Sequence, residues 1–186
     1  MQKTLLSRRQ FLGTTGKVVV AATACKWMCG EACAAARPDI CVAAVCGIYC
    51  GACSQQLRDD PPGSQCLGCR STTRAPDYAL QCEVKKCADA KQLPSCGLCR
   101  DYPCARIQAF FNDTPKYGLR EKNLDAIRDR GLPAWLNEQK ARWTCQKCKA
   151  PFGYGARACP QCGAEVYSDA EEFEAFKKAK AAKAMA

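Results

Sequence analysis

Residues 46–53 read Cys-Gly-Ile-Tyr-Cys-Gly-Ala-Cys, which places three cysteines within eight positions. Packing alone would use leucine or valine there, because they bury more apolar area without a reactive thiol. So dense a set of thiols indicates either a disulfide framework or metal sites. Ten core cysteines lie in this part of the chain: Cys46, Cys50, Cys53, Cys66, Cys69, Cys82, Cys87, Cys96, Cys99 and Cys104.

Two Cys-x2-Cys pairs, Cys66–Cys69 and Cys96–Cys99, favour metal ligation over disulfides. Each contains a glycine, which permits the positive φ of a tight turn, and such a turn lets two sulfur atoms bind one metal. Disulfides between neighbouring pairs would close short loops and give little entropic stabilisation. We therefore expect all ten core cysteines to bind zinc or an iron–sulfur cluster, with disulfides as the alternative. The ten divide as four plus four plus two, or as six plus four.

The spacing of Cys46, Cys50 and Cys53 coincides with the cluster motif of radical S-adenosylmethionine enzymes. We disfavour that interpretation, because Ala52 stands where an aromatic residue is usual and too few residues follow for the large partial barrel. The chain also lacks histidine, which excludes Ser-His-Asp catalysis, Cys-His catalysis and histidine metal ligands. The sequence therefore favours a binding protein over an enzyme.

The formal net charge is +10, from 28 Lys and Arg against 18 Asp and Glu. We do not predict nucleic-acid binding, because the basic residues are scattered and are not interleaved with aromatic ones. Each four-cysteine site around a divalent ion also carries a net charge of about −2, so several such sites would offset much of the excess.

The N-terminus resembles a twin-arginine export leader. Arg8 and Arg9 precede Phe-Leu and a moderately apolar run, and three alanines at 34–36 form a small-residue cleavage site. Residues 1–36 therefore predict export by the twin-arginine machinery to the periplasm or the outer face of the cytoplasmic membrane. The chain would contact the membrane only through a retained leader. An ordinary basic N-terminal helix is the alternative, and the sequence assigns no role to Cys25, Cys29, Cys33 or Cys41.

Helices are expected to cover the cysteine-rich core within residues 38–143. The apolar pattern predicts a helix over 104–111, a break at 112–115, a helix over 119–130 capped by Gly131, and a third helix that opens at Pro133. No catalytic array is visible in these helices. Their acidic residues are expected on a solvated face: Asp125, Asp129 and Glu138.

Residues 144–167 carry a second cysteine pattern, Cys-x2-Cys-x10-Cys-x2-Cys, formed by Cys145, Cys148, Cys159 and Cys162. It resembles a short zinc ribbon in which each pair, or knuckle, ends a β-hairpin. Four thiolates at this spacing suit a tetrahedral zinc ion, and rubredoxin-like iron is the alternative. In residues 168–186, Ser168 and Glu171 form a capping box that predicts a C-terminal helix.

The ordered cysteine blocks CGIYCGAC, CLGC and CEVKKCADAKQLPSCGLCRDYPC, followed by GLPAWL, resemble the bacterial and archaeal cysteine-rich family known as domain of unknown function 3795. The resemblance covers about residues 46–143, and all ten core cysteines match the family's pattern. It implies a small domain that looks metal-binding, and it supplies no activity, substrate or catalytic residue.

The sequence thus predicts a small, metal-stabilised, mostly helical fold with irregular cysteine-rich loops, zinc-ribbon β-hairpins and a terminal helix. The expected function is that of an exported metal-binding protein, with an iron–sulfur centre for electron transfer or sensing and an unidentified redox or protein partner. A zinc-stabilised structural or interaction module is one alternative. A thiol–disulfide exchange enzyme built on Cys96 and Cys99 is the other.

Overall fold

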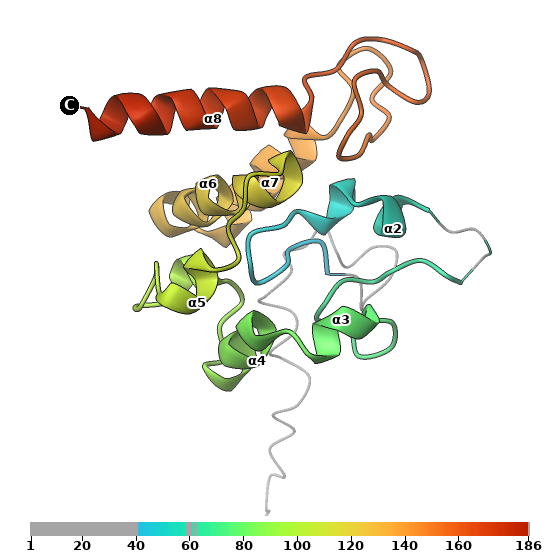
Figure 1. Ribbon diagram of the computed structural model, residues 1–186. Coiled ribbons are helices and arrows are strands. Elements are labelled where there is room, and N and C mark those ends of the chain that lie inside the picture. Colours follow the sequence, from blue (N-terminus) through green and yellow to red (C-terminus); the bar gives the residue numbers. More distant parts are fainter. Residues whose placement is uncertain (1–40, 59–60, 62, 186) are drawn as a thin grey trace, which may run out of the picture.

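The computed structural model describes residues 41–58, 61 and 63–185 (Figure 1). The predicted leader, with Arg8, Arg9 and the three cysteines at 25, 29 and 33, lies outside these residues. In the part of the chain that the model describes, no helix is both long and apolar enough to cross a membrane.

The described residues form a mostly helical structure in which irregular loops carry many of the cysteines. Short helices come first, and three longer ones follow. In chain order they are η2 Cys50–Ala52, α2 Ser54–Leu57, α3 Asp77–Leu80, α4 Glu83–Ala90, η3 Cys96–Leu98, α5 Ala105–Gln108, α6 Pro115–Arg130, α7 Leu132–Arg142 and α8 Asp169–Ala184. The predicted helical class is confirmed.

Two helix boundaries differ from the sequence prediction. The first covering helix, α5, is shorter than residues 104–111. Pro115 begins α6 at its first turn, where a missing N–H costs nothing, so the second helix starts four residues before the predicted residue 119. The predicted end is confirmed, because Gly131 follows the helix with φ of 83°.

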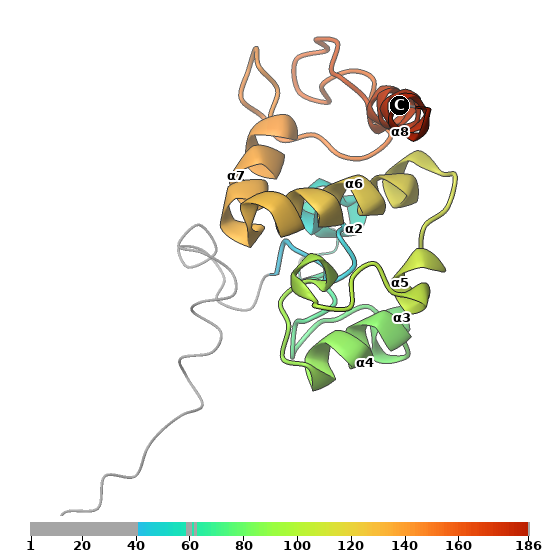
Figure 2. The ribbon, with the colours of Figure 1, turned by 90° about the vertical axis from the view of Figure 1, so that its left-hand side faces the viewer.

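Helix α6 lies at the centre of the molecule (Figures 1 and 2). Helix α8 runs along one side of it, and α4, α5 and the cysteine-rich loops lie on the other side. The apolar positions predicted for α6 are fully buried there: Leu124 and Ile127 have no exposed surface and Leu119 almost none. This single helix therefore joins the cysteine-rich segment to the C-terminal part of the chain.

Helix α8 begins as the sequence predicts. The Ser168 side chain accepts a hydrogen bond from the Glu171 amide, and the Glu171 carboxylate accepts one from the Ser168 amide. Its buried face includes Phe173, which packs against α6, and Glu172, which forms ion pairs with Lys122 at 2.7 Å and Arg142 at 2.8 Å. The buried face thus docks through one ring and one carboxylate, and Lys180 further along α8 pairs with Glu121 of α6 at 2.6 Å.

The predicted β-hairpins of the ribbon are not supported. Among the described residues this region has two isolated antiparallel bridges, Thr144 with Pro151 and Ala158 with Glu165, and no longer strand. The first pairing ends at the Phe152 amide, which donates to the Trp143 carbonyl at 3.0 Å, because Trp143 already caps the end of α7 and Pro151 has no amide hydrogen to donate. The Phe152 and Tyr154 rings pack on Trp143, with ring centroids 5.4 and 4.5 Å from the Trp143 ring.

The ribbon, residues 144–167, also packs against the first cysteine-rich turn. The Tyr154 amide donates to the Ala52 carbonyl at 2.9 Å, and the Tyr154 hydroxyl accepts from the Tyr49 amide at 3.2 Å. Ala52 lies between Cys50 and Cys53, so this contact supports the turn that carries two core thiols.

Candidate metal centres

The four ribbon cysteines converge on one point. Their sulfur atoms all lie within 4.8 Å of one another, with 3.7 Å between Cys145 and Cys162 and 3.5 Å between Cys148 and Cys159. A tetrahedral ion with metal–sulfur bonds of about 2.3 Å places its sulfurs about 3.8 Å apart. The donor type, the number of donors and the spacing therefore all fit a single tetrahedral ion.

The two knuckles repeat the same backbone turn. In the first, the Cys145 amide donates to the Ala150 carbonyl and the Lys149 amide donates back to the Cys145 carbonyl. In the second, the Cys159 amide donates to Ala164 and the Gly163 amide donates to Cys159. Each turn closes with a positive φ at the residue after its second cysteine, 61° at Lys149 and 68° at Gly163.

Backbone amides inside each turn favour the thiolate form of its first cysteine. The amide of Cys148, followed by that of Lys147, lowers the pKa of Cys145 to about 6. The amides of Cys162 and Gln161 likewise lower the pKa of Cys159. At Cys148 the Ala150 amide acts in the same direction, but burial and the three neighbouring thiols outweigh it and raise the pKa to about 12. Because thiolates are the metal-binding form, these turns are prepared for a cation.

Six of the core cysteines line a cavity of about 230 Å³, which we call the six-thiol cavity. The turn that contains η2 supplies two of them, and the irregular loop between α2 and α3 supplies another two. The loop that precedes η2 supplies a fifth, and the residue before α4 supplies the sixth. Its thiols are Cys46, Cys50, Cys53, Cys66, Cys69 and Cys82.

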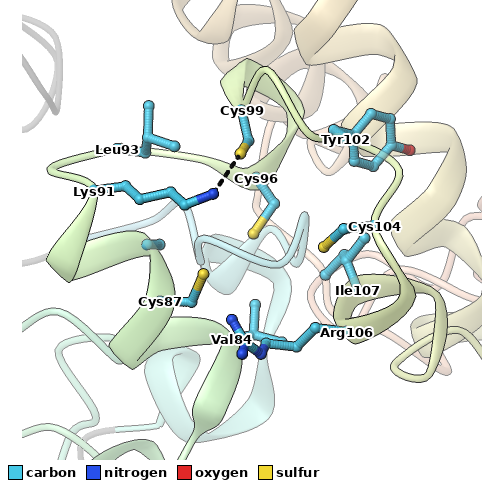
Figure 3. Close-up of a pocket in the computed structure, with 11 residues that line it drawn as sticks. Val84, Cys87, Lys91, Leu93, Cys96, Cys99, Tyr102, Cys104, Arg106 and Ile107 are labelled. Carbon is cyan, nitrogen blue, oxygen red and sulfur yellow. Dashed lines mark hydrogen bonds between the residues drawn. The ribbon is translucent and has the colours of Figure 1, made fainter.

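The other four core cysteines line a smaller cavity of about 30 Å³, the four-thiol cavity (Figure 3). They come from α4, the two ends of η3 and the residue before α5: Cys87, Cys96, Cys99 and Cys104. In Figure 3 the sulfurs of Cys87, Cys96 and Cys104 face a common space, whereas Cys99 points to the Lys91 amine, 3.7 Å away. The structure therefore divides the ten core thiols into six and four.

The core thiols differ from the ribbon set in spacing and in protonation. In the part of the chain that the structure describes, the ribbon set is the one group of three or more ligands close enough for a single ion. Burial raises the pKa of Cys50, that of Cys69 to about 11 and that of Cys96 to about 12. These thiols are protonated at neutral pH without a cation, so a metal would have to displace their protons.

None of the fourteen predicted ligands forms a disulfide in the structure: Cys46, Cys50, Cys53, Cys66, Cys69, Cys82, Cys87, Cys96, Cys99, Cys104, Cys145, Cys148, Cys159 and Cys162. Every one of them lies in one of the three groups above, and no group mixes ribbon and core residues.

Glycine has different roles in the two core Cys-x2-Cys pairs. Gly68 has φ of 94°, as the sequence predicts for a tight turn. Gly97 is not among the residues with positive φ, so the predicted reason is wrong there. A Cβ at Gly97 would lie 2.5 Å from the Leu124 carbonyl oxygen, so this glycine instead allows η3 to approach α6 closely.

Three polar residues of α6 face the first cysteine-rich loop, and the sequence analysis did not identify them. Lys116 and Arg120 line the six-thiol cavity. Asn123 is buried, donates to the Gly47 carbonyl at 2.8 Å and accepts from the Trp135 indole at 3.3 Å, so it fixes the loop that carries Cys46. Their i, i+4, i+7 spacing marks one helix face, but the face is visible only when α6 begins at Pro115.

The predicted solvated face is confirmed, because Asp125, Asp129 and Glu138 are all exposed. Asp125 accepts a hydrogen bond from the Tyr102 hydroxyl at 2.8 Å, close to the four-thiol cavity that Tyr102 lines. Glu138 pairs with Arg130 at 2.7 Å on the surface. The partners of these two carboxylates are thus a tyrosine hydroxyl and an arginine.

Comparison with known proteins gave one match. No curated protein and no solved structure matched the chain. Residues 42–109, which contain all ten core cysteines but stop short of the GLPAWL segment at residues 131–136, match the model of the family described as protein of unknown function DUF3795.

Proposed function

We propose that this protein is an exported metal-binding protein with a zinc ion in the ribbon and further metal in the two core cavities. The observation that carries the proposal is the convergence of four ribbon sulfurs within 4.8 Å, at the spacing of a tetrahedral ion. The core metal, zinc or an iron–sulfur cluster, is ligated by the ten core cysteines. With a cluster, the protein transfers electrons or senses redox state for a partner protein.

Export fits a metal protein of this kind. The paired arginines Arg8 and Arg9 begin the leader of the twin-arginine route, which transports proteins already folded. A cofactor inserted in the cytoplasm would then protect the thiols before the chain reaches the oxidising periplasm. The proposed location is the periplasm or the outer face of the cytoplasmic membrane.

The second candidate function is a zinc-stabilised structural or interaction module. It is favoured by the way the ribbon supports the Cys50–Cys53 turn through Tyr154 and Ala52, since an ion there would stabilise the interior. Thiol–disulfide exchange is disfavoured. The attacking cysteine of such enzymes has a lowered pKa, whereas burial raises the pKa of Cys96 to about 12.

Metal analysis of the full chain tests the ribbon assignment. The protein is purified anaerobically, and zinc and iron per chain are measured for the wild type and for Cys148→Ser combined with Cys162→Ser. Since serine is a poor ligand for soft metal sites, this variant should lose about one zinc ion per chain. The matched control is Lys147→Ser combined with Gln161→Ser, two exposed positions in the same knuckles. Equal zinc in both variants contradicts the proposed site.

A further inference from the structure

We propose that the six-thiol cavity, and not the four-thiol cavity, is the binding site of an iron–sulfur cluster. Four of its six cysteines hold the cluster, together with the cationic face of α6, which is formed by Lys116 and Arg120. The inference rests on the proposed function, because it takes the core cysteines to be metal ligands. It goes beyond it by naming the cavity, the kind of metal centre and two residues that act on the cluster from outside the ligand set.

Cavity size separates the two core sites. The six-thiol cavity has a volume of about 230 Å³ and the four-thiol cavity about 30 Å³. A single water needs about 10–15 Å³ by this measure, so the smaller space admits little more than one or two small species. A cluster of several irons and sulfides needs the larger space, and its irons hold their thiolates further apart than one ion does. Among the described core residues, no three cysteine sulfurs lie close enough together for a single ion, which agrees with this wider spacing.

The charge of the lining residues also favours the six-thiol cavity. A cluster with four thiolates is an anion, so cations beside it stabilise it. The Lys116 amine lies 3.5 Å from the Cys53 sulfur, and among the described residues neither Lys116 nor Arg120 has a carboxylate partner. Two cations line the four-thiol cavity: Lys91, which is already paired with Asp101 at 2.5 Å, and Arg106, which has no carboxylate partner among the described residues. The six-thiol cavity thus has two unpaired cations, Lys116 and Arg120, and the smaller cavity has one.

Arg120 also carries an unused donor. Its guanidinium donates one hydrogen bond to the Phe110 carbonyl at 2.6 Å and lies over the Tyr117 ring, but its Nε is buried without a hydrogen-bond partner. A buried donor without a partner costs about 1–3 kcal/mol. Because the same side chain lines the six-thiol cavity, a bound sulfide or thiolate would supply the missing acceptor.

The cationic face is held rigidly against the thiols. Lys116 and Arg120 lie one turn apart on α6, and Asn123 on the next turn anchors the loop after Cys46 through the Gly47 carbonyl. Asn123 therefore ties the helix that carries the two cations to the loop that carries Cys46. Cations that lie beside a cluster set its reduction potential through charge and hydrogen bonding.

Reconstitution of the full chain with ferrous iron and sulfide under anaerobic conditions tests the site. We expect equal amounts of iron and inorganic sulfide, visible absorption and an electron paramagnetic resonance signal after reduction. A triple variant, Cys50→Ser with Cys53→Ser and Cys69→Ser, should lose at least nine-tenths of the sulfide, because it leaves three thiols in a cavity whose cluster takes four. Cys87→Ser combined with Cys99→Ser, two thiols of the other cavity, should keep the wild-type sulfide content.

The inference is overturned if the variant of the four-thiol cavity loses the sulfide and the variant of the six-thiol cavity keeps it. It is also overturned if the wild-type protein keeps its ribbon zinc but takes up no sulfide. The latter result leaves the proposed metal-binding function intact. A chain without metal in the ribbon or in either cavity overturns both proposals, so the two failures are distinguishable.

Reduction potentials supply a measurement that does not depend on removing a ligand. Lys116→Gln and Arg120→Gln each remove one positive charge beside the cluster, and reduction adds negative charge to it. Each substitution should therefore make the potential more negative, while Lys91→Gln at the four-thiol cavity leaves it at the wild-type value. A potential that shifts with Lys91→Gln, but not with Lys116→Gln or Arg120→Gln, would place the cluster in the four-thiol cavity and refute the assignment.

Discussion

Lys149 and Gly163 hold equivalent positions in the two ribbon turns, and both have a positive φ. Each residue donates its amide to the carbonyl of the first cysteine of its own turn. The repeat shows that the turn demands this backbone conformation at both places. A left-handed conformation costs a residue with a side chain about 1–2 kcal/mol, a cost that only the first knuckle bears.

Substitution at these two positions should have unequal effects. Gly163→Ala should lower the free energy of unfolding by about 1 kcal/mol, because it adds the left-handed cost and recovers only part of it from a less flexible unfolded chain. Lys149→Gly should change it by less than about 1 kcal/mol, since relief of strain and added chain entropy oppose each other. Denaturant unfolding followed by tryptophan fluorescence, to which Trp143 beside the first knuckle contributes, measures both. A larger loss for Lys149→Gly contradicts the shared turn.

At the scale of elements, α8 is held by the buried carboxylate of Glu172. It is 6% exposed and pairs with Lys122 of α6 and Arg142 of α7, so one residue connects three helices. Arg142 also stacks on the Trp143 and Tyr167 rings, and its two terminal nitrogens are buried without hydrogen-bond partners in the described chain. Glu172 is therefore the carboxylate that neutralises the charge of Arg142.

Glu172→Gln should destabilise the protein by about 3–5 kcal/mol, because it leaves the buried guanidinium without its counter-charge. Chemical denaturation measures the change. The control is Glu174→Gln on the same helix, whose partner Lys177 lies 2.6 Å away on the surface; it should cost no more than about 1 kcal/mol. Equal costs for the two variants exclude a special role for the buried network.

At the scale of the whole molecule, the cysteine-rich segment has little apolar material of its own. Between residues 41 and 104, few large side chains are fully buried, namely Val45, Leu67 and Val84. Ordering the backbone costs roughly 1–2 kcal/mol per residue, and a structural zinc site contributes on the order of 10 kcal/mol in small peptides. The segment should therefore fold only with its metal.

Chelation of the anaerobic protein should abolish the cooperative unfolding of this segment, while dithiothreitol alone should leave it intact. Circular dichroism and hydrogen exchange follow the change, and re-addition of the metal should restore the folded state. A disulfide framework predicts the reverse: resistance to chelator and collapse with reductant. That outcome, in a protein that contains no metal, contradicts the metal model of the core.

The proposed export is a property of the whole chain, and on the twin-arginine interpretation it requires Arg8 and Arg9. Arg8→Lys combined with Arg9→Lys keeps the charge but removes the paired guanidinium groups, so we expect the protein to accumulate in the cytoplasm. Arg37→Lys, outside the motif, is the matched control and should reach the periplasm. Fractionation of cells measures both, and normal export of the double variant counts against the leader.

Local patterns predicted much of this structure. The capping box at Ser168 and Glu171 and the end of α6 at Gly131 depend on neighbouring residues, and both are observed. The convergence of the ribbon thiols follows from two short turns close in sequence. The predicted hairpins are not observed, because Trp143 still caps the end of α7 and Pro151 lacks an amide hydrogen, so the pairing of Thr144 with Pro151 does not extend into a strand.

The sequence by itself determined that ten thiols gather in one segment and that four more form a separate set. Only the tertiary structure decided the division of the ten into six and four, since Cys82 and Cys87 are five residues apart but line different cavities. The cationic face was equally invisible, because Lys116 is 63 residues from Cys53 and meets it only after α6 packs across the cysteine-rich loops. Turns are set by local backbone preferences, whereas cavities are set by which distant elements share one core.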